Sequence, residues 1–204
     1  MLGYYNYTVV LTYIGMLFGF SGILQTLNGN YHGAVMCLMA AGLCDMFDGK
    51  VASTMQRTRS QKRFGIQIDS LSDLICFGVL LAVIACTGST LKWAPAASGI
   101  YCLCALIRLA WFNVDEEERQ EKEDGSRRVY YGLPVTSAAL IIPMILGITG
   151  RSVSTAEVAG PVLMLVMAVA FITPFQLKKP ETAGKAAILL CGVAEMGLLL
   201  KGMI

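Results

Sequence analysis

Charged residues are scarce in this chain. They make up 15% of its 204 residues, whereas 55% of the residues are hydrophobic and the mean hydropathy is +0.62. A soluble domain needs a larger polar surface, so this composition indicates an integral membrane protein. The formal net charge of +2 is too small, and the basic residues are too scattered, to indicate a nucleic-acid partner.

Histidine is nearly absent, and the cysteines have no metal-binding spacing. His32 is the single histidine, and it lies in a short predicted turn far along its helix from the acidic residues, which argues against a histidine general base. The seven cysteines fall mostly inside apolar segments and form no Cys-x-x-Cys pair. We interpret them as small residues that pack between helices, because neither a disulfide framework nor a zinc site fits this pattern.

Apolar runs of about 17 to 25 residues, long enough to cross a bilayer, recur along the chain. We expect six membrane helices, near 7–27, 33–53, 67–87, 93–113, 132–149 and 155–175. A seventh run, near 183–203, is interrupted by Glu195, and 114–131 is the one extended hydrophilic loop. No basic flank precedes the first run, so we expect it to remain as a membrane helix. The predicted fold class is therefore all-α, a polytopic transmembrane helical bundle that forms a single domain over 1–204.

The distribution of Lys and Arg predicts the orientation in the cell membrane, because positively charged flanks are retained in the cytoplasm. With the 54–66 loop in the cytoplasm, that side collects 12 of the 16 basic residues. The opposite side has only Lys92, Arg151 and Lys201, while Arg108 lies within a helix. The aspartates described next are therefore expected to face the cytoplasm.

Four aspartates stand at the ends of two apolar segments: Asp45 and Asp48 in one, Asp69 and Asp73 in the other. On helices, the i,i+3 pair and the i,i+4 pair each occupy one face. An unpaired aspartate at the centre of a membrane helix costs about 2.5 to 3.5 kcal/mol, so four of them need compensation. If the two faces are turned toward each other, they form an oxygen-only pocket that repels itself unless cations fill it.

The residues alone leave three kinds of compensation open. One is an ion-pair network with the basic residues Arg57, Arg59, Lys62 and Arg63. These lie in the intervening loop rather than opposite the aspartates, which disfavours that reading. Another is a cation or proton pathway, as in a small transporter, although no acidic residue continues toward the other face. The third, which we favour over a transporter or a non-catalytic packing partner, is a bound pair of divalent cations.

Small residues near the aspartates indicate phosphate chemistry. Gly49 follows Asp48 directly, Ala52 comes three residues later, and Gly65 lies four residues before Asp69. The lack of bulky side chains lets a diphosphate approach the backbone and a metal closely. Hard divalent cations with oxygen ligands commonly bridge phosphates and stabilise an in-line displacement.

The pattern Asp-x2-Asp-Gly-x2-Ala…Gly-x3-Asp-x3-Asp, from Asp45 to Asp73, resembles the signature of the CDP-alcohol phosphatidyltransferase family. The family pattern has an arginine after the alanine and then eight residues before the second glycine. This chain has Ser53 and eleven residues instead. Arg57, one helical turn beyond Ser53, is expected to reach a similar place if the helix continues.

Within that family, the resemblance is to class II phosphatidylserine synthases. It is carried by the segments 68–79, 106–114, 131–136 and 173–180. The second of these segments usually has another arginine where this chain has Trp111.

The resemblance implies a mechanism and a set of site residues. Asp45, Asp48 and Asp69, with help from Asp73, are expected to hold two divalent cations, Mg²⁺ or Mn²⁺, which clamp the diphosphate of CDP-diacylglycerol. Asp73 then takes a proton from the acceptor hydroxyl, the alkoxide attacks the lipid-side phosphorus, and CMP departs. The remaining candidates for substrate binding are Gly49, Ala52, Ser53, Arg57, Gly65, Arg108 and Asn113.

The acceptor and the assembly state follow from the same resemblance. L-serine is the expected acceptor, with glycerol 3-phosphate, an inositol phosphate or another alcohol as alternatives. Arg108, as an intramembrane cation, either pairs with a neighbouring helix or receives the serine carboxylate or a lipid phosphate. Family members also imply a homodimer in contact with membrane lipid.

Overall fold

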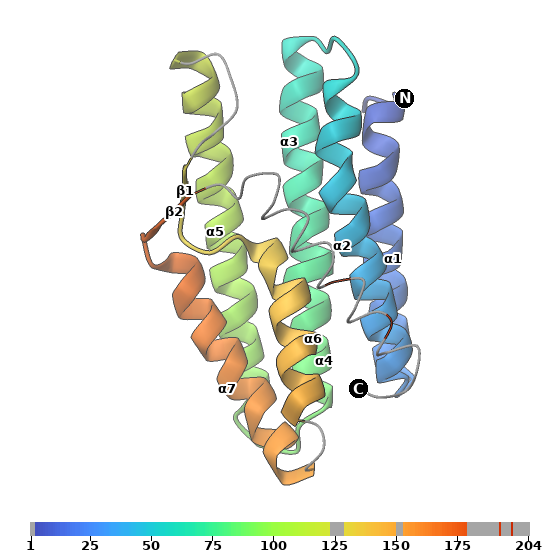
Figure 1. Cartoon of the computed structure of the whole chain (residues 1–204), viewed down its shortest axis with the longest axis vertical. Coiled ribbons are helices and arrows are strands. Elements are labelled where there is room, and N and C mark those ends of the chain that lie inside the picture. Colours follow the sequence, from blue (N-terminus) through green and yellow to red (C-terminus); the bar gives the residue numbers. More distant parts are fainter. Residues whose placement is uncertain (1–2, 123–128, 150–152, 179–191, 193–196, 198–204) are drawn as a thin grey trace.

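The computed structural model describes residues 3–122, 129–149 and 153–178, together with positions 192 and 197. Its helices run roughly along the long axis of the molecule (Figure 1). They are α1 (Val10–Leu27), α2 (Tyr31–Ser53), α3 (Arg59–Asp73), α4 (Leu80–Thr87), α5 (Ala94–Lys122), α6 (Ala138–Thr149) and α7 (Val153–Ile172). All six predicted runs contain helix, which confirms the all-α bundle. The seventh run, near 183–203, lies outside the described residues except for those two positions.

The helices have the length and the surface of membrane spans. Three described helices are long and apolar enough to cross a bilayer: Tyr7–Leu27, Arg59–Thr87 and Ala94–Arg119. Large apolar side chains point outward, such as Leu17 with 61% of its surface exposed and Val166 with 59%. Water would solvate this surface poorly, whereas lipid chains solvate it well. The chain is therefore a multi-pass membrane protein.

A π-helical turn, Leu74–Val79, joins α3 to α4, so that Arg59–Thr87 forms one long helix. The turn starts directly after Asp73. Such wider turns disturb the regular ladder of backbone hydrogen bonds and are frequent at functional sites. Here the hydroxyl of Tyr101, a fully buried residue of α5, donates a hydrogen bond of 2.6 Å to the carbonyl of Phe77. The side chain of Tyr101 therefore stabilises the irregular turn.

The hydrophobic core lies where α2, α4, α5 and α7 meet. Its largest fully buried side chains include Leu38, Leu80, Tyr101, Met164 and Phe171. The rings of Tyr101 and Phe171 are tilted against each other, with centroids 5.4 Å apart. The turn that joins α2 to α3 lies at the upper end of the bundle in Figure 1.

The predicted 54–66 loop is mostly wrong, because α3 begins at Arg59. Thr58 caps this helix with a capping box: its side chain accepts a hydrogen bond from the backbone of Gln61, and the Gln61 side chain accepts one from the backbone of Thr58. This reciprocal arrangement satisfies backbone donors that otherwise lack partners at a helix start. Only the short turn 54–58 separates α2 from α3.

The predicted loop 114–131 is also partly wrong, because α5 continues to Lys122. Glutamate, lysine and arginine favour helix, so a run of them extends a helix beyond the membrane rather than ending it. Glu116 and Arg119 add an i,i+3 ion pair of 2.6 Å on this extension.

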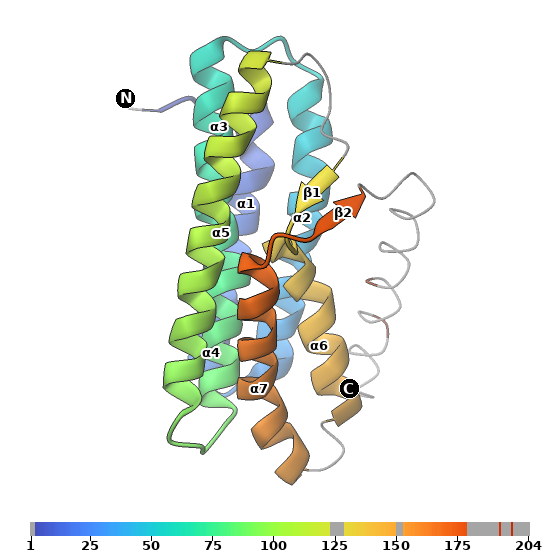
Figure 2. The ribbon, with the colours of Figure 1, turned by 90° about the vertical axis from the view of Figure 1, so that its left-hand side faces the viewer.

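A two-stranded ribbon lies beside the bundle, in contrast to the purely helical expectation (Figure 2). β1 (Val129–Tyr131) pairs antiparallel with β2 (Gln176–Lys178). Gly132 follows β1 with a φ of +71°, a conformation that favours glycine, and its amide donates to the carbonyl of Phe175 over 2.8 Å. The ribbon connects the chain that follows α5 with the end of α7.

Candidate active site

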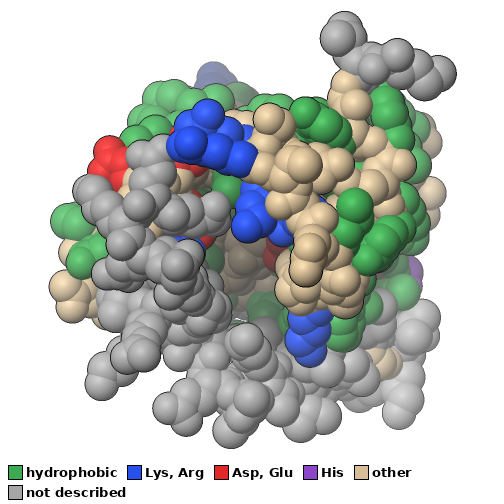
Figure 3. Space-filling model, turned by 90° about the horizontal axis from the view of Figure 1, so that it is seen from above, with side chains coloured by type: hydrophobic (Ala, Val, Ile, Leu, Met, Phe, Trp, Pro, Cys, Tyr) green, Lys and Arg blue, Asp and Glu red, His purple; other side chains and the backbone are tan. Residues whose placement is uncertain are grey.

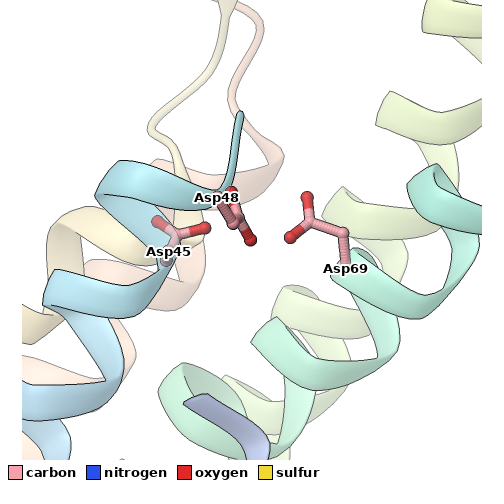
Figure 4. A group of neighbouring side chains, drawn as sticks. All are labelled: Asp45, Asp48 and Asp69. Carbon is pink, nitrogen blue, oxygen red and sulfur yellow. The ribbon is translucent and has the colours of Figure 1, made fainter. Parts of the chain in front are cut away.

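Three of the four aspartates converge from two helices. Asp45 and Asp48 lie in the last three turns of α2 and face Asp69 of α3 (Figure 4). One carboxylate oxygen from each lies within 4.8 Å of the other two. Two oxygens bound to the same Mg²⁺ or Ca²⁺ ion lie at most roughly 4 to 5 Å apart. The separation therefore fits a shared cation.

Asp73 lies one turn below Asp69 and lines the same small cavity, which has a volume of ≈ 10 Å³. Only 9% of its surface is exposed. Asp45 lines this cavity as well. The structure thus brings all four predicted aspartates to one site, with three grouped at cation distance and Asp73 behind them.

The donor chemistry of the site fits a hard divalent cation. The three grouped residues offer only carboxylate oxygens, which Mg²⁺ and Mn²⁺ prefer. The Oδ1 atom of Asp69 is buried and has no hydrogen-bond partner among the described residues. A buried carboxylate oxygen without a partner is costly, and a cation would satisfy it.

Helix α1 forms the back wall of the site, which the sequence did not reveal. It packs against both α2 and the α3–α4 helix. Thr12 of α1 is buried, and its Oγ1 donates a hydrogen bond of 3.1 Å to Oδ2 of Asp48. The hydroxyl of Ser72 donates to the backbone carbonyl of Thr12 over 3.4 Å. Thr12 therefore links Asp48 to α3, the helix that carries Asp69 and Asp73.

Glycines let α1 come this close. A Cβ atom on Gly15 would lie 3.2 Å from Cβ of Cys44, and one on Gly19 would lie 2.5 Å from Sγ of Cys76. The second distance is too short for any real side chain. The small-residue spacing in the first apolar run thus serves close helix packing, and this packing places Thr12 at the carboxylates.

Helix α5 supports the other side of α3 through Asn113. The hydroxyl of Ser70 donates to Oδ1 of Asn113 over 2.7 Å, and Nδ2 of Asn113 donates to Oε1 of Gln67 over 3.3 Å. Asn113 is 8% exposed. Its amide oxygen and nitrogen both have partners on α3 beside Asp69, so the structure gives this substrate-binding candidate a role in holding the two helices together.

The small residues of α2 lie on its open side. A Cβ atom on Gly49 would meet no atom within 4 Å, so space is free there. Ala52 is half-buried, and the hydroxyl of Ser53 donates to the carbonyl of Lys50 in its own helix over 2.7 Å. Gly49 thus leaves room for a ligand, while the hydroxyl of Ser53 is already engaged.

Arg57 comes close to Gly65 by a route that differs from the one expected. The helix does not continue beyond Ser53, because Thr54 forms its C-cap and donates through Oγ1 to the carbonyl of Val51. The turn nevertheless carries the Arg57 guanidinium to Gly65, where a Cβ atom would lie 3.1 Å from Nη1. The continuing helix is therefore wrong, while Arg57 still lies close to the second glycine of the motif.

Arg108 lies apart from the carboxylate cavity. It is 6% exposed, and its guanidinium carbon lies 5.7 Å and 5.3 Å from the ring centroids of Trp111 and Phe112. A Cβ atom on Gly132 would lie 3.5 Å from its Nε. Arg108 is thus placed between α5 and the β1–β2 ribbon.

A model of the family described as CDP-alcohol phosphatidyltransferase matches residues 5–176. The chain belongs to this family. The match spans α1 to the start of β2 and so includes all four aspartates, Arg57 and Arg108.

Several curated proteins are similar in sequence to this chain, and their names include serine. The CDP-diacylglycerol–serine O-phosphatidyltransferase of Saccharomyces cerevisiae is 34% identical over 145 residues, which are 65% of this chain and 51% of that protein. The protein of the same name from Mycobacterium tuberculosis is 26% identical over 132 residues, 64% of this chain and 45% of its own. The archaetidylserine synthase of Methanothermobacter thermautotrophicus is 28% identical over 168 residues, 81% and 66% of the two chains. The chain spans about half the length of the first two relatives.

Proposed function

We propose that this protein transfers a phosphatidyl group from CDP-diacylglycerol to L-serine, giving phosphatidylserine and CMP. The observation that carries the proposal is the group of three carboxylates from α2 and α3 within 4.8 Å of one another, in a chain of the CDP-alcohol phosphatidyltransferase family. The names of the relatives support serine as the acceptor.

The carboxylates of Asp45, Asp48 and Asp69 would hold two divalent cations, Mg²⁺ or Mn²⁺, with help from Asp73. Bound cations would supply positive charge that offsets the carboxylates and polarises the diphosphate. Thr12 orients Asp48 by hydrogen bonding to one of its oxygens, which leaves the other oxygen for a ligand.

Asp73 is the proposed general base. It lines the cavity together with the other three aspartates, and its carboxylate would take the proton from the acceptor hydroxyl. The acceptor oxygen forms a bond to the lipid-side phosphorus while the bond from that phosphorus to the CMP oxygen breaks. CMP leaves with the electron pair of that bond.

Residues at the upper end of α2 and α3 would bind the nucleotide side of the donor. Gly49 and Ala52 offer a surface without bulky side chains, and Gly65 leaves room for the guanidinium of Arg57 to face a phosphate. Ser53 follows Ala52, and its hydroxyl donates to a carbonyl of its own helix. Its small side chain would therefore leave room for the donor without a hydrogen bond to it.

Arg108 and Asn113 of α5 are the proposed acceptor-side residues, with Arg108 for the serine carboxylate and Asn113 beside Asp69. Arg108→Lys would keep the charge and lose the planar fork that binds a carboxylate with two hydrogen bonds. We expect a KM for serine raised roughly 10-fold with the KM for CDP-diacylglycerol unchanged. An equal rise in the KM for serine and the KM for CDP-diacylglycerol would contradict a role for Arg108 in serine binding.

The wider setting of the site is also proposed. The excess of basic residues on the side of the α2–α3 turn supports an active site that faces the cytoplasm. We further propose that 1–204 acts as one membrane domain in contact with lipid and assembles as a homodimer. Labelling of single cysteines introduced into the 54–58 turn, with an impermeant reagent on intact cells, tests the orientation: rapid labelling from outside contradicts it.

The decisive experiment uses purified protein with CDP-diacylglycerol, Mn²⁺ and labelled serine, followed by chromatography of the lipid product. Labelled phosphatidylserine together with equimolar CMP is expected. Parallel reactions with glycerol 3-phosphate, an inositol phosphate and other alcohols test the alternatives. Product from one of these and none from serine overturns the acceptor assignment. Divalent-cation flux into sealed vesicles without any CMP release indicates a transporter instead.

A further inference from the structure

The segment before α1 folds over the turn that carries Arg57. The hydroxyl of Tyr7 lies 3.0 Å from Oγ1 of Thr54, across 47 residues of sequence. The ring of Tyr4 packs edge-on against that of Phe64, with centroids 5.5 Å apart. The two contacts fall on either side of Arg57 in the sequence, one at the end of α2 and one in the first turns of α3.

This segment is itself held in a fixed conformation. The side chain of Asn6 accepts a hydrogen bond of 3.2 Å from the backbone of Thr8 and caps the short 3₁₀ turn Tyr7–Val9. The hydroxyl of Tyr13 in α1 donates to the carbonyl of Tyr4 over 3.4 Å. Tyr4 and Tyr7 are therefore attached to α1, the helix that also holds Asp48 through Thr12.

Arg57 lies in the chain between the residues that make these two contacts, Thr54 and Phe64. Its side chain is half-buried, and its Nε is buried with no hydrogen-bond partner among the described residues. By contrast, Arg63 on the same side pairs with Glu117 at 3.5 Å. A buried guanidinium N–H group without a partner is rare in folded proteins unless a ligand or water satisfies it.

The guanidinium of Arg57 lies one helical turn from Asp69, the aspartate nearest to Gly65 in the sequence. It lies against Gly65, which is four residues before Asp69 and so shares the same helix face, about 6 Å further along the axis. Viewed from above, basic side chains stand beside a hollow in this end of the bundle (Figure 3). A cation held one helical turn outside a group of carboxylates suits a ligand that carries several negative oxygens.

We propose that Tyr4 and Tyr7 are positioning residues for substrate binding: they fasten the 54–58 turn to α1 and thereby hold Arg57 over Gly65, where it binds the diphosphate of the nucleotide-activated lipid. This inference rests on the proposed function for the nature of the ligand. It assigns the segment before α1 to donor binding rather than to membrane anchoring alone. A planar guanidinium needs a fixed orientation to meet phosphate oxygens with two hydrogen bonds, which a loose turn would not provide.

The test is a set of variants made in the full chain. Tyr4→Ala/Tyr7→Phe removes both contacts, and we expect the KM for CDP-diacylglycerol to rise roughly 3- to 10-fold with kcat within about twofold. Arg57→Ala should raise the same KM roughly 10- to 100-fold. Combining the three substitutions should give the KM of Arg57→Ala alone, because the tyrosines act through Arg57. Tyr31→Phe removes a hydroxyl at the opposite end of α2 and serves as the control with unchanged KM.

Each outcome decides between the positioning role and a general effect on folding. Mn²⁺ affinity, measured separately, should be the same in all variants, which shows that the carboxylate group is intact. If the tyrosine substitutions multiply the effect of Arg57→Ala, or if either change leaves the KM unaltered, the inference is wrong. If the wild-type protein releases no CMP with any acceptor, the proposed function itself fails, which is a separate result.

Discussion

Thr12 of α1 donates a hydrogen bond of 3.1 Å to Asp48 of α2, so a helix without any acidic residue takes part in arranging the carboxylates. The bond holds the carboxylate of Asp48, one oxygen of which lies within 4.8 Å of an oxygen of Asp45 and of Asp69. Partners of this kind commonly decide how well a metal site binds, because they hold the ligand in one orientation.

Replacing Thr12 by valine should therefore weaken metal binding. Valine keeps the shape of threonine and removes the hydrogen-bond donor, so we expect Mn²⁺ affinity to fall roughly 10-fold. Titration calorimetry or Mn²⁺ electron paramagnetic resonance measures this directly. Thr26→Val is the matched control, since Thr26 lies in the same helix and its hydroxyl donates to the carbonyl of Gly22 over 2.9 Å, away from the carboxylates. Equal affinities for the two variants would contradict a role for Thr12.

Replacing Asp73 by asparagine should separate chemistry from binding. The amide has nearly the shape of the carboxylate but cannot accept the acceptor proton, so turnover is expected to fall at least about 100-fold. Binding of CDP-diacylglycerol should remain substantial, because Asp45, Asp48 and Asp69 keep their positions. Single-turnover CMP release and equilibrium binding measure the two quantities. A turnover rate near that of the wild type would contradict the assignment of Asp73 as the general base.

Gly19→Ala should destabilise the protein. The added Cβ would lie 2.5 Å from Sγ and 3.2 Å from Cα of Cys76, so α1 must move away from the α3–α4 helix. Overpacking of this kind typically costs about 1 to 3 kcal/mol. Thermal unfolding in detergent should show a lower Tm than for Gly99→Ala, because a Cβ on Gly99 in α5 meets no atom within 4 Å. A Tm for Gly19→Ala at or above that of the control would contradict the close packing.

Removal of divalent cations should lower stability as well as activity. A ligand that binds only the folded state stabilises it, and four neighbouring carboxylates repel one another without cations. We expect a chelator to abolish CMP release and to lower Tm by a few degrees, with both effects reversed by Mn²⁺. The double variant Asp45→Asn/Asp48→Asn should show little response of Tm to the chelator. A response as large as that of the wild type would place the stabilising cation elsewhere.

The spacing of residues along the sequence was enough to predict the helices and the position of the aspartates on them. The apolar runs predicted the helices, and the intervals between Asp45, Asp48, Asp69 and Asp73 predicted that each pair occupies one face. The helices and the shared face of each aspartate pair rest on the helical repeat, which the sequence carries directly, whereas the meeting of the two faces was a condition that the spacing alone did not settle. The extension of α5 to Lys122 was missed because strongly charged residues were interpreted as a loop, although their helix propensity is high.

Features that depend on tertiary contacts were beyond the sequence. Thr12 lies 36 residues from Asp48, and an isolated threonine in an apolar run gives no signal of its partner. Arg57 lies in the turn after the end of α2, between the Tyr7–Thr54 and Tyr4–Phe64 contacts, and spacing alone predicts neither the end of α2 nor these contacts. The β1–β2 ribbon joins segments more than forty residues apart, and each strand is only three residues long.

The π-helical turn at Leu74–Val79 changes the direction in which side chains point around the axis of the long helix Arg59–Thr87. A π turn holds one residue more than a regular α-helical turn, and one residue corresponds to about 100° of rotation. The polar face that ends at Asp73 and the apolar face that starts at Leu80 can thus each point at its own partners. Deleting one residue of this turn would restore a regular helix but turn the carboxylates away from α2, so the irregular turn sets the direction in which the acidic face points.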